Sequence, residues 1–289
     1  MKILVVGDLH GNKPKIYFKD FDVIIAPGDF CSDGHKKYIF RAIREQLKDS
    51  NSEVEWYDFV GERKARQMMN KSLNDGRRIL EFLNSFGKPV YLVPGNWDQT
   101  GYKKSRLDFE RKNRWNDMIN GLENIVDVHY KRRTINRDFD VIGYGIVSGP
   151  EYPQYKEDLK RYDKRELKSL KTKFNRTKKR LSKLFVKAKM PVIFMPHNVP
   201  FNTSLDKITN KESPKYGYHY GSVIARELIE KYKPLLCIGG HMHEHFGKTK
   251  LGKTVCINAG FGSKVNTLID LDEEKGRIRS IKFHPRTYG

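Results

Sequence analysis

Gly239-Gly240-His241-Met242-His243 directly follows the apolar run Leu235-Leu236-Cys237-Ile238. Two glycines at the end of a strand let the backbone turn sharply and approach another group closely. The two imidazoles on that turn can then face the same crevice. Because neutral imidazole binds Zn, Mn and Fe well, the stretch predicts a metal site. On its own it is weak evidence, since two neighbouring histidines are more often an ordinary surface or core feature.

Four other short apolar runs end in the same way. Each run passes through a turn and reaches an Asp, Asn or His, namely Asp8 and His10 after residues 2–6, Asp29 after 22–26, Asn96 after 90–93 and His197 after 192–195. Continuous Val, Ile and Leu runs are typical of strands that are buried on both faces, as in a sheet covered by helices. Open sheets of this kind bind ligands beyond the carboxyl ends of their strands. All five motifs stand where that rule places a site.

The composition is that of a globular protein. With 289 residues, 38% of them hydrophobic and 12% aromatic, the chain can bury a sizeable core. No apolar run approaches the roughly 20 residues of a membrane span, and the first strand leaves no room for a signal peptide. Three cysteines are an odd number, and Cys237 and Cys256 lie in apolar runs. We therefore expect free thiols, a reduced cytoplasmic location and no membrane partner.

The formal net charge of +21 is the compositional outlier. Residues 155–189 hold fifteen Lys and Arg against four Asp and Glu, with apolar residues spaced by threes, fours and sevens. This pattern predicts one long basic helix. Two interpretations stay open. The helix is either a crossover that packs on the sheet with its lysines in water, or a surface that follows the phosphates of a nucleic acid.

Alternation of strands and helices predicts parallel βαβ units in a single domain, residues 1–289. Helices are predicted at 34–48, 60–86, 109–120, 155–189 and 221–231, with a loop at 49–58. Residues 125–128 form a short apolar piece in a less regular region, and further strands are predicted at 139–147, 254–257, 267–271 and 277–283, the last two forming a hairpin.

The five motifs, in this order, resemble the calcineurin-like metallophosphoesterase superfamily. Its blocks correspond to Asp8 with His10, Gly28-Asp29, Gly95-Asn96-Trp97-Asp98, His197 and Gly240-His241-Met242-His243. The chain most resembles the small prokaryotic phosphoesterase and phosphodiesterase subgroup in five further stretches, namely Pro196-His197-Asn198-Val199-Pro200, Leu205-Asp206, Gly221-Ser222, His243-Glu244 and Asn258-Ala259-Gly260. The resemblance implies an α/β fold, a four-layer αββα sandwich with a dinuclear metal site at the carboxyl ends of the strands.

The resemblance also implies a ligand set. Metal site 1 would use Asp8, His10, Asp29 and His243, and site 2 would use Asp29, Asn96, His197 and His241, with Asp29 shared. Mixed carboxylate, amide and imidazole ligands favour two divalent ions, Mn²⁺ first, with Fe, Zn or Mg as alternatives. Two such ions can hold a bridging hydroxide that attacks phosphorus in line with the leaving group.

Trp97 departs from the family pattern. Many members carry a histidine there that protonates the leaving oxygen, whereas an indole offers only an N–H donor. His219 is the first candidate to replace that histidine as a catalytic residue, with His35 and His245 behind it. Asp98 is the other candidate catalytic residue, although without an imidazole partner it would only brace its loop.

Three residues beside the ligands complete the predicted site. Asn12 and Trp97 are candidate substrate-binding residues, and Asp33 is predicted to support the ligands or form a turn.

Three functions stay open. A phosphodiesterase acting on a small phosphodiester or nucleotide is favoured, because members that lack the histidine tend towards diesters. A nuclease of the same chemistry would use the basic surface. A non-catalytic metal-binding scaffold is the third reading, although none of the seven ligands is missing. The sequence leaves the oligomeric state open.

Overall fold

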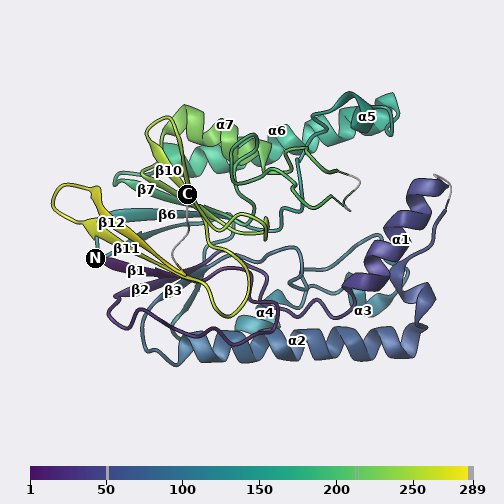
Figure 1. The fold of residues 1–289 in the computed structure, drawn as a ribbon, viewed down its shortest axis with the longest axis horizontal. Coiled ribbons are helices and arrows are strands. Elements are labelled where there is room, and N and C mark those ends of the chain that lie inside the picture. The colour runs from purple at the N-terminus through teal and green to yellow at the C-terminus, as the bar shows by residue number, and fades with distance from the viewer. Residues whose placement is uncertain (50–51, 212, 214, 286–289) are drawn as a thin grey trace.

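The structure is a computed structural model that describes residues 1–49, 52–211, 213 and 215–285 (Figure 1). Its elements in chain order are β1 (Lys2–Val5), β2 (Val23–Ala26), α1 (Lys36–Lys48), the 3₁₀ helix η1 (Trp56–Phe59), α2 (Glu62–Asn84), β3 (Val90–Leu92), α3 (Asp108–Arg111), α4 (Trp115–Ile119), β4 (Ile125–Asp127), β5 (Arg132–Ile135), β6 (Phe139–Tyr144), α5 (Lys156–Leu159), α6 (Lys164–Val186), β7 (Val192–Pro196), α7 (Val223–Tyr232), β8 (Leu236–Gly239), β9 (Gly247–Leu251), β10 (Thr254–Asn258), β11 (Asn266–Asp272) and β12 (Arg277–His284).

Two six-stranded mixed sheets lie face to face between helices. One sheet has the order β12-β11-β1-β2-β3-β4 and the other β5-β6-β7-β8-β10-β9. Helices α2 and α4 lie on the outer side of the first sheet, and α6 and α7 lie on the outer side of the second (Figure 1). The predicted four-layer αββα sandwich is confirmed.

Side-chain alternation along the strands builds three apolar layers. In β1, Ile3 and Val5 point between the sheets, whereas Leu4 points to the helices on the outside. A period of two puts successive side chains on opposite faces of a strand, so a continuous apolar run fills two layers at once. The second outer layer is closed by Phe174, Leu181 and Phe185 of α6.

The strands that carry the predicted motifs run in parallel within each sheet. β1 pairs with β2 and β2 with β3, while β7 pairs with β8, all in parallel register. Parallel strands end at the same edge, so the turns after β1, β2, β3, β7 and β8 meet at one end of the sandwich.

The basic segment is a crossover helix, but it is shorter than predicted. The helix predicted over 155–189 is divided into α5 and α6, because Asp163 and Glu166 form a capping box that starts a new helix. A similar division separates α3 from α4 within the helix predicted over 109–120.

Besides β4, which lies in the apolar piece at 125–128, two strands and one short helix were not predicted. β5 begins within the basic triplet at 131–133, and β9 carries exposed lysines on an edge, so neither has the apolar run of a buried strand. The 3₁₀ helix η1 lies inside the predicted loop at 49–58, of which 50 and 51 are outside the described residues. The predicted hairpin of β11 and β12 is confirmed, and β11 pairs with β1 to extend the first sheet.

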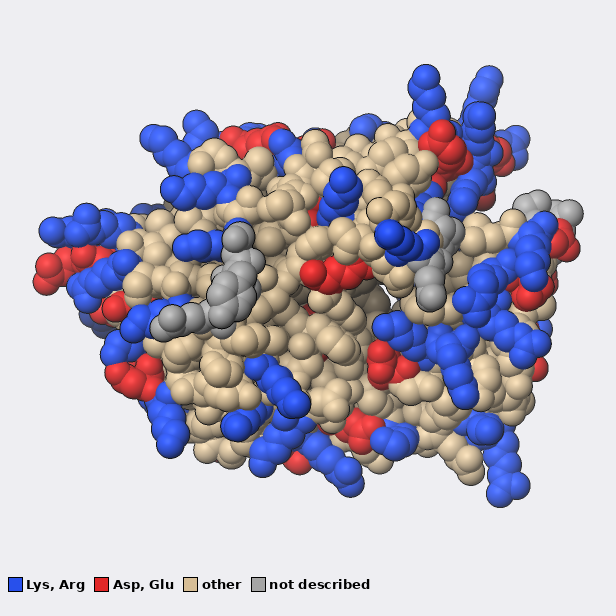
Figure 2. Space-filling view, in the orientation of Figure 1, with Lys and Arg blue, Asp and Glu red and all other residues tan. Residues whose placement is uncertain are grey.

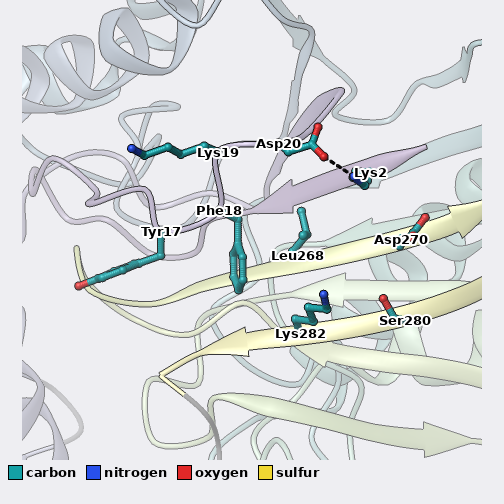
Figure 3. Close-up of a pocket in the computed structure, with 9 residues that line it drawn as sticks. All are labelled: Lys2, Tyr17, Phe18, Lys19, Asp20, Leu268, Asp270, Ser280 and Lys282. Atoms are coloured by element: carbon teal, nitrogen blue, oxygen red, sulfur yellow. Dashed lines mark hydrogen bonds and ion pairs between the residues drawn. The ribbon is translucent and has the colours of Figure 1, made fainter.

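A hollow of about 310 Å³ lies on the outer face of the first sheet, where residues 17–20 cross β1, β11 and β12 (Figure 3). Its charges are partly balanced, since Lys2 pairs with Asp20 and Asp270 also lines it. None of the seven predicted ligands is among its lining residues. Among the helices that the structure describes, none is long and apolar enough to cross a membrane.

Candidate metal centre

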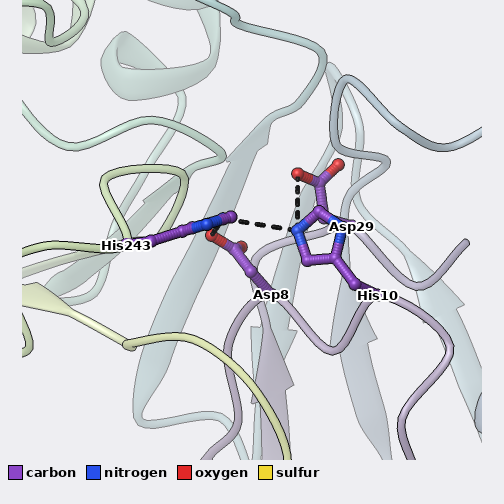
Figure 4. A group of neighbouring side chains, drawn as sticks. All are labelled: Asp8, His10, Asp29 and His243. Atoms are coloured by element: carbon purple, nitrogen blue, oxygen red, sulfur yellow. Dashed lines mark hydrogen bonds and ion pairs between the residues drawn. The ribbon is translucent and has the colours of Figure 1, made fainter. Parts of the chain in front are cut away.

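Four of the predicted ligands form one compact group. One donor atom from each of Asp8, His10, Asp29 and His243 lies within 4.8 Å of the others (Figure 4). The Nε2 atoms of His10 and His243 face each other at 3.3 Å. His243 Nε2 lies 3.3 Å from Asp8 Oδ2, and His10 Nε2 lies 3.6 Å from Asp29 Oδ2. Residues from the turns after β1, β2 and β8 therefore converge on one point.

A second group shares Asp29 with the first. Donor atoms of Asp29, His197 and His241 also lie within 4.8 Å of one another. His197 Nε2 is 3.4 Å from Asp29 Oδ2 and 3.0 Å from Asn96 Oδ1, which brings Asn96 into the group. The carboxylate oxygen Asp29 Oδ2 thus stands between the imidazoles of His10 and His197, as a ligand common to two sites would.

Backbone carbonyls fix two of the imidazoles. His197 Nδ1 lies 2.8 Å from the carbonyl oxygen of Pro27, and His241 Nε2 lies 3.1 Å from that of Ser148. A ring nitrogen that donates to a carbonyl leaves the other nitrogen with its lone pair free. These contacts therefore turn Nε2 of His197 and Nδ1 of His241 towards the group.

The turns that carry the ligands are held in unusual conformations. His10, Asp29 and His241 have φ angles of 44°, 58° and 67°, in the left-handed region that non-glycine residues seldom adopt. Close packing adds to this constraint. A Cβ atom on Gly95 would lie 2.1 Å from Asp29 Oδ1, and one on Gly240 would lie 2.4 Å from Asp8 Oδ1. These two glycines are required for the carboxylates to approach the turns.

Asp98 braces two of the turns. Its Oδ1 accepts the N–H groups of Phe30 and Cys31 at 2.9 and 3.0 Å, and its Oδ2 accepts those of Asp29 and Gly95 at 3.0 and 2.8 Å. Burial and the neighbouring Asp29 raise the pKa of Asp98 to about 7, while the four N–H donors favour its anion. Asp98 therefore holds the turns after β2 and β3 together. Its predicted catalytic role stays a prediction.

The group is electrostatically suited to cations. Burial disfavours the charged form of His197, yet Asp29 and its neighbours raise the pKa of this imidazole to about 9. Burial lowers the pKa of His241 to about 4, and His197 adds to that effect. Although burial acts the other way, His197 and His10 hold the pKa of Asp29 well below its ordinary value. The carboxylates thus stabilise positive charge strongly at this point.

The donor set fits two divalent ions. Among the residues that the structure describes, the buried atoms Asp8 Oδ1, His10 Nδ1 and Asp29 Oδ2 have no hydrogen-bond partner. Unpaired buried carboxylate oxygens are costly, and a coordinated cation would satisfy them. Oxygen and imidazole donors in this mixture suit Mn, Fe or Zn.

The predicted substrate residues lie beside the group. Trp97 donates its backbone N–H to Asp29 Oδ1 at 2.8 Å, and its ring lies edge-on to His10 at 6.0 Å between centroids. Asn12 is exposed and donates its amide to the carbonyls of Leu9 and His10. Neither contact tests a role in substrate binding, which stays a prediction.

The candidate proton donors occupy different surroundings. His219 Nδ1 lies 2.7 Å from Asp206 Oδ1, and its ring lies near Phe201. His35 lies between Trp56 and Trp97, and burial lowers its pKa to about 4, which favours the neutral imidazole over the imidazolium that a general acid needs. His245 Nε2 bonds to the carbonyl of Lys207.

Two backbone carbonyls support the ligands although residue type could not predict them, whereas one aromatic residue beside the ligands could have been predicted. The carbonyls of Pro27 and Ser148 orient ligands, but every residue has a backbone carbonyl, so the residue types at these positions do not indicate this role. Phe261 stacks on His243, and its place in Gly260-Phe261-Gly262 after a strand could have indicated it. Asp33, predicted as a supporting residue, lies 3.8 Å from His10 Nδ1.

Comparisons with known proteins agree with this geometry. The sequence profile of the calcineurin-like phosphoesterase family matches residues 1–245. One solved crystal structure aligns over 98% of this chain and 97% of its own, at 15% identity and a TM-score of 0.58. The crystal structure of a Thermus thermophilus protein, TT1561, aligns over the same shares, at 16% identity and a TM-score of 0.52. These low identities show a common fold alone. No curated protein matches the chain.

Proposed function

Because this chain belongs to the calcineurin-like phosphoesterase family, and is thus a metal-dependent hydrolase of phosphoric esters, we propose that it is a phosphodiesterase acting on a small phosphodiester or nucleotide. The seven predicted ligands would hold two divalent ions in two groups that share Asp29. We propose Mn²⁺ as the native metal.

The charge around the group carries this proposal. Within the described ranges, no lysine or arginine forms a hydrogen bond or ion pair with any of the seven ligands. A phosphomonoester carries a charge of about −1.5 to −2 at pH 7, whereas a diester carries only one negative charge. A centre without added cationic side chains favours the less charged ester. Trp97 supports the same choice, because family members that lack a histidine at this position tend towards diesters.

The residues of the chain have separate tasks in this reaction. Two bound cations would supply the charge that neutralises the phosphoryl oxygens and favours ionisation of a water molecule. Asp29 fixes the spacing of the two groups, since both use its Oδ2. Asp98 holds the turns in register, and the carbonyls of Pro27 and Ser148 keep the lone pairs of His197 and His241 facing inward.

The extent and location of the protein are also proposals. We propose that residues 1–289 form one domain, because β11, beyond the matched segment, pairs with β1 and β10 pairs with β8. Cys31, Cys237 and Cys256 are free and buried, which fits a reduced cytoplasmic location.

Bis(p-nitrophenyl) phosphate and p-nitrophenyl phosphate test the proposal, since they share one leaving group. We expect the Mn²⁺-supplemented protein to cleave the diester with a kcat/KM at least about 10-fold higher, and EDTA to abolish both reactions. A kcat/KM that is higher for the monoester would contradict the proposed diesterase activity, but it would not count against the metal centre.

A nuclease is the second candidate, favoured by the surface of α6. This helix holds ten Lys and Arg and one acidic residue, and its outward side carries an exposed row at helical spacing, namely Arg165, Lys168, Arg176, Lys179 and Lys183. The row runs along the side opposite the buried Phe174, Leu181 and Phe185. Lys and Arg also stand around much of the face seen in Figure 2, which is hollowed near its centre. Such a surface suits a polyanion.

Replacing Lys168, Arg176 and Lys179 with Gln tests this candidate. If the row contacts phosphates, the slope of log Kd against log salt for an oligonucleotide duplex should fall by up to about 3. The matched control replaces Lys248, Lys250 and Lys253, three exposed lysines in and beside β9, and removes the same charge. Equal slopes in both variants would mean that the row on α6 only solubilises the protein.

A further inference from the structure

An aromatic ring with an open face lies at the metal centre. Phe261 stacks on His243 with 4.1 Å between ring centroids and 21° between planes, and lies 5.4 Å from the ring of His10. Yet Phe261 is 42% exposed. His243 stacks on one face of the ring, so the other face is the side from which a ligand would meet it. A large apolar surface is thus held in water beside a cluster of charged groups.

The backbone fixes Phe261 in this place. Gly260 and Gly262, on either side, have φ angles of 81° and 83°, which favour glycine. The N–H of Gly260 donates to Asn258 Oδ1 at 2.9 Å, and the N–H of Gly262 donates to the carbonyl of Asp8 at 2.9 Å. The loop that carries the phenyl ring is therefore tied to the same turn that supplies a predicted ligand.

A second aromatic ring also contacts His10. Trp97 is half-buried and is backed by His35, whose ring lies 5.2 Å from the indole. Aromatic residues from two distant parts of the chain, the turn after β3 and the loop after β10, therefore flank the same ligand. The predicted ligand His10 thus has an aromatic ring on two sides.

We propose that Phe261 is a stacking platform for a planar aromatic group of the substrate, so that the substrate class is a phosphoester with a nucleobase or aryl group close to its phosphorus. The inference rests on the phosphoester chemistry proposed above. An aromatic ring on the open face of Phe261 would bury apolar surface on both rings, while the phosphate lies at the adjacent ligands. Stacking of this kind accepts any π face and so selects for aromaticity more than for a particular base.

A purely structural role for Phe261 makes a different prediction. If the ring serves only to hold His243 in place, its loss would weaken the binding of every phosphate ligand to the same degree. A platform instead changes affinity only for ligands that carry a ring. Methylphenylphosphinate and dimethylphosphinate separate the two roles, because these monoanionic analogues of a diester have no ester bond to cleave, share the charged PO₂ group and differ only in the ring.

The test measures the dissociation constants of these two ligands with the Mn²⁺-loaded protein by calorimetry. We expect the wild type to bind methylphenylphosphinate about 5- to 100-fold more tightly than dimethylphosphinate. Phe261→Leu should bring that ratio close to one through loss of affinity for methylphenylphosphinate alone, and Phe261→Tyr should retain it. Phe40→Leu is the matched control, since Phe40 is a similarly exposed phenylalanine on α1.

Several outcomes would overturn the platform. These are a wild-type ratio near one, an unchanged ratio in Phe261→Leu, an equal loss for both ligands in that variant, and no binding of either ligand. Elemental analysis of each variant checks that its metal content is unchanged. Because the ratio needs no turnover, it is independent of the hydrolysis of bis(p-nitrophenyl) phosphate, whose failure would instead count against the proposed diesterase.

Discussion

Replacement of Asp29 with alanine or asparagine is expected to lower kcat/KM for bis(p-nitrophenyl) phosphate by well over 100-fold, at any metal concentration that saturates the wild type. Loss of a residue that only supports a ligand costs about 10- to 100-fold, and Asp29 Oδ2 belongs to both groups. Asparagine is the sharper change. It keeps the size of the side chain and an acceptor for the N–H of Trp97, so the charge is the main loss.

Asp140→Asn is the matched control for this prediction. Asp140 is as buried as Asp29, but it pairs with Arg132 and accepts N–H groups from Lys189 and Met190, away from the predicted ligands. Loss of that carboxylate is expected to lower the free energy of unfolding and leave kcat/KM within about 3-fold of the wild type. A parallel loss of activity in both variants would mean that Asp29 acts on stability and not on catalysis.

Leaving-group dependence is expected to be steep in the wild type. With an indole at position 97, departing oxygens must leave largely unprotonated, so diesters of acidic phenols should react well and alkyl esters poorly. Trp97→His should raise kcat/KM for the poor leaving groups selectively, by about 10²-fold, the lower end of what general acid catalysis contributes. Trp97→Phe keeps an aromatic ring without a proton and should retain the steep dependence.

His219→Ala completes the series. If His219 supplies a proton, held in orientation by Asp206, its loss should lower rates for poor leaving groups and leave those for p-nitrophenyl esters nearly unchanged. The measurement is kcat/KM for aryl and alkyl diesters against the pKa of the leaving alcohol. A wild-type rate that hardly varies with that pKa, and is unchanged in His219→Ala, would require a proton donor other than His219.

The buried parallel strands and the meeting of their motifs at one edge could be predicted from local patterns, whereas the four-layer sandwich and the division of the ligands into two sites followed only from the resemblance to a family. Apolar runs such as Val23–Ala26 are typical of strands buried on both faces, and parallel strands bring their carboxyl ends to one edge. Asp29 and His197 therefore meet although they lie far apart in the sequence.

Other features depend on contacts that residue type does not record. β9 is an edge strand with exposed lysines, so its pairing with β10 gives no apolar signal. The break before α6 depends on the capping box of Asp163 and Glu166, which lies within a continuous helical pattern. The carbonyl of Ser148, which orients His241, is a backbone group that any residue could offer.

The metal content of the purified chain decides whether the seven ligands form a dinuclear centre. After removal of metal and reconstitution with Mn²⁺, elemental analysis should find two ions per wild-type chain, and substantially fewer than one per chain of Asp29→Ala, because both groups lose a ligand at once. Two ions retained in Asp29→Ala, or no ion bound by the wild type, would contradict a dinuclear centre built on this carboxylate.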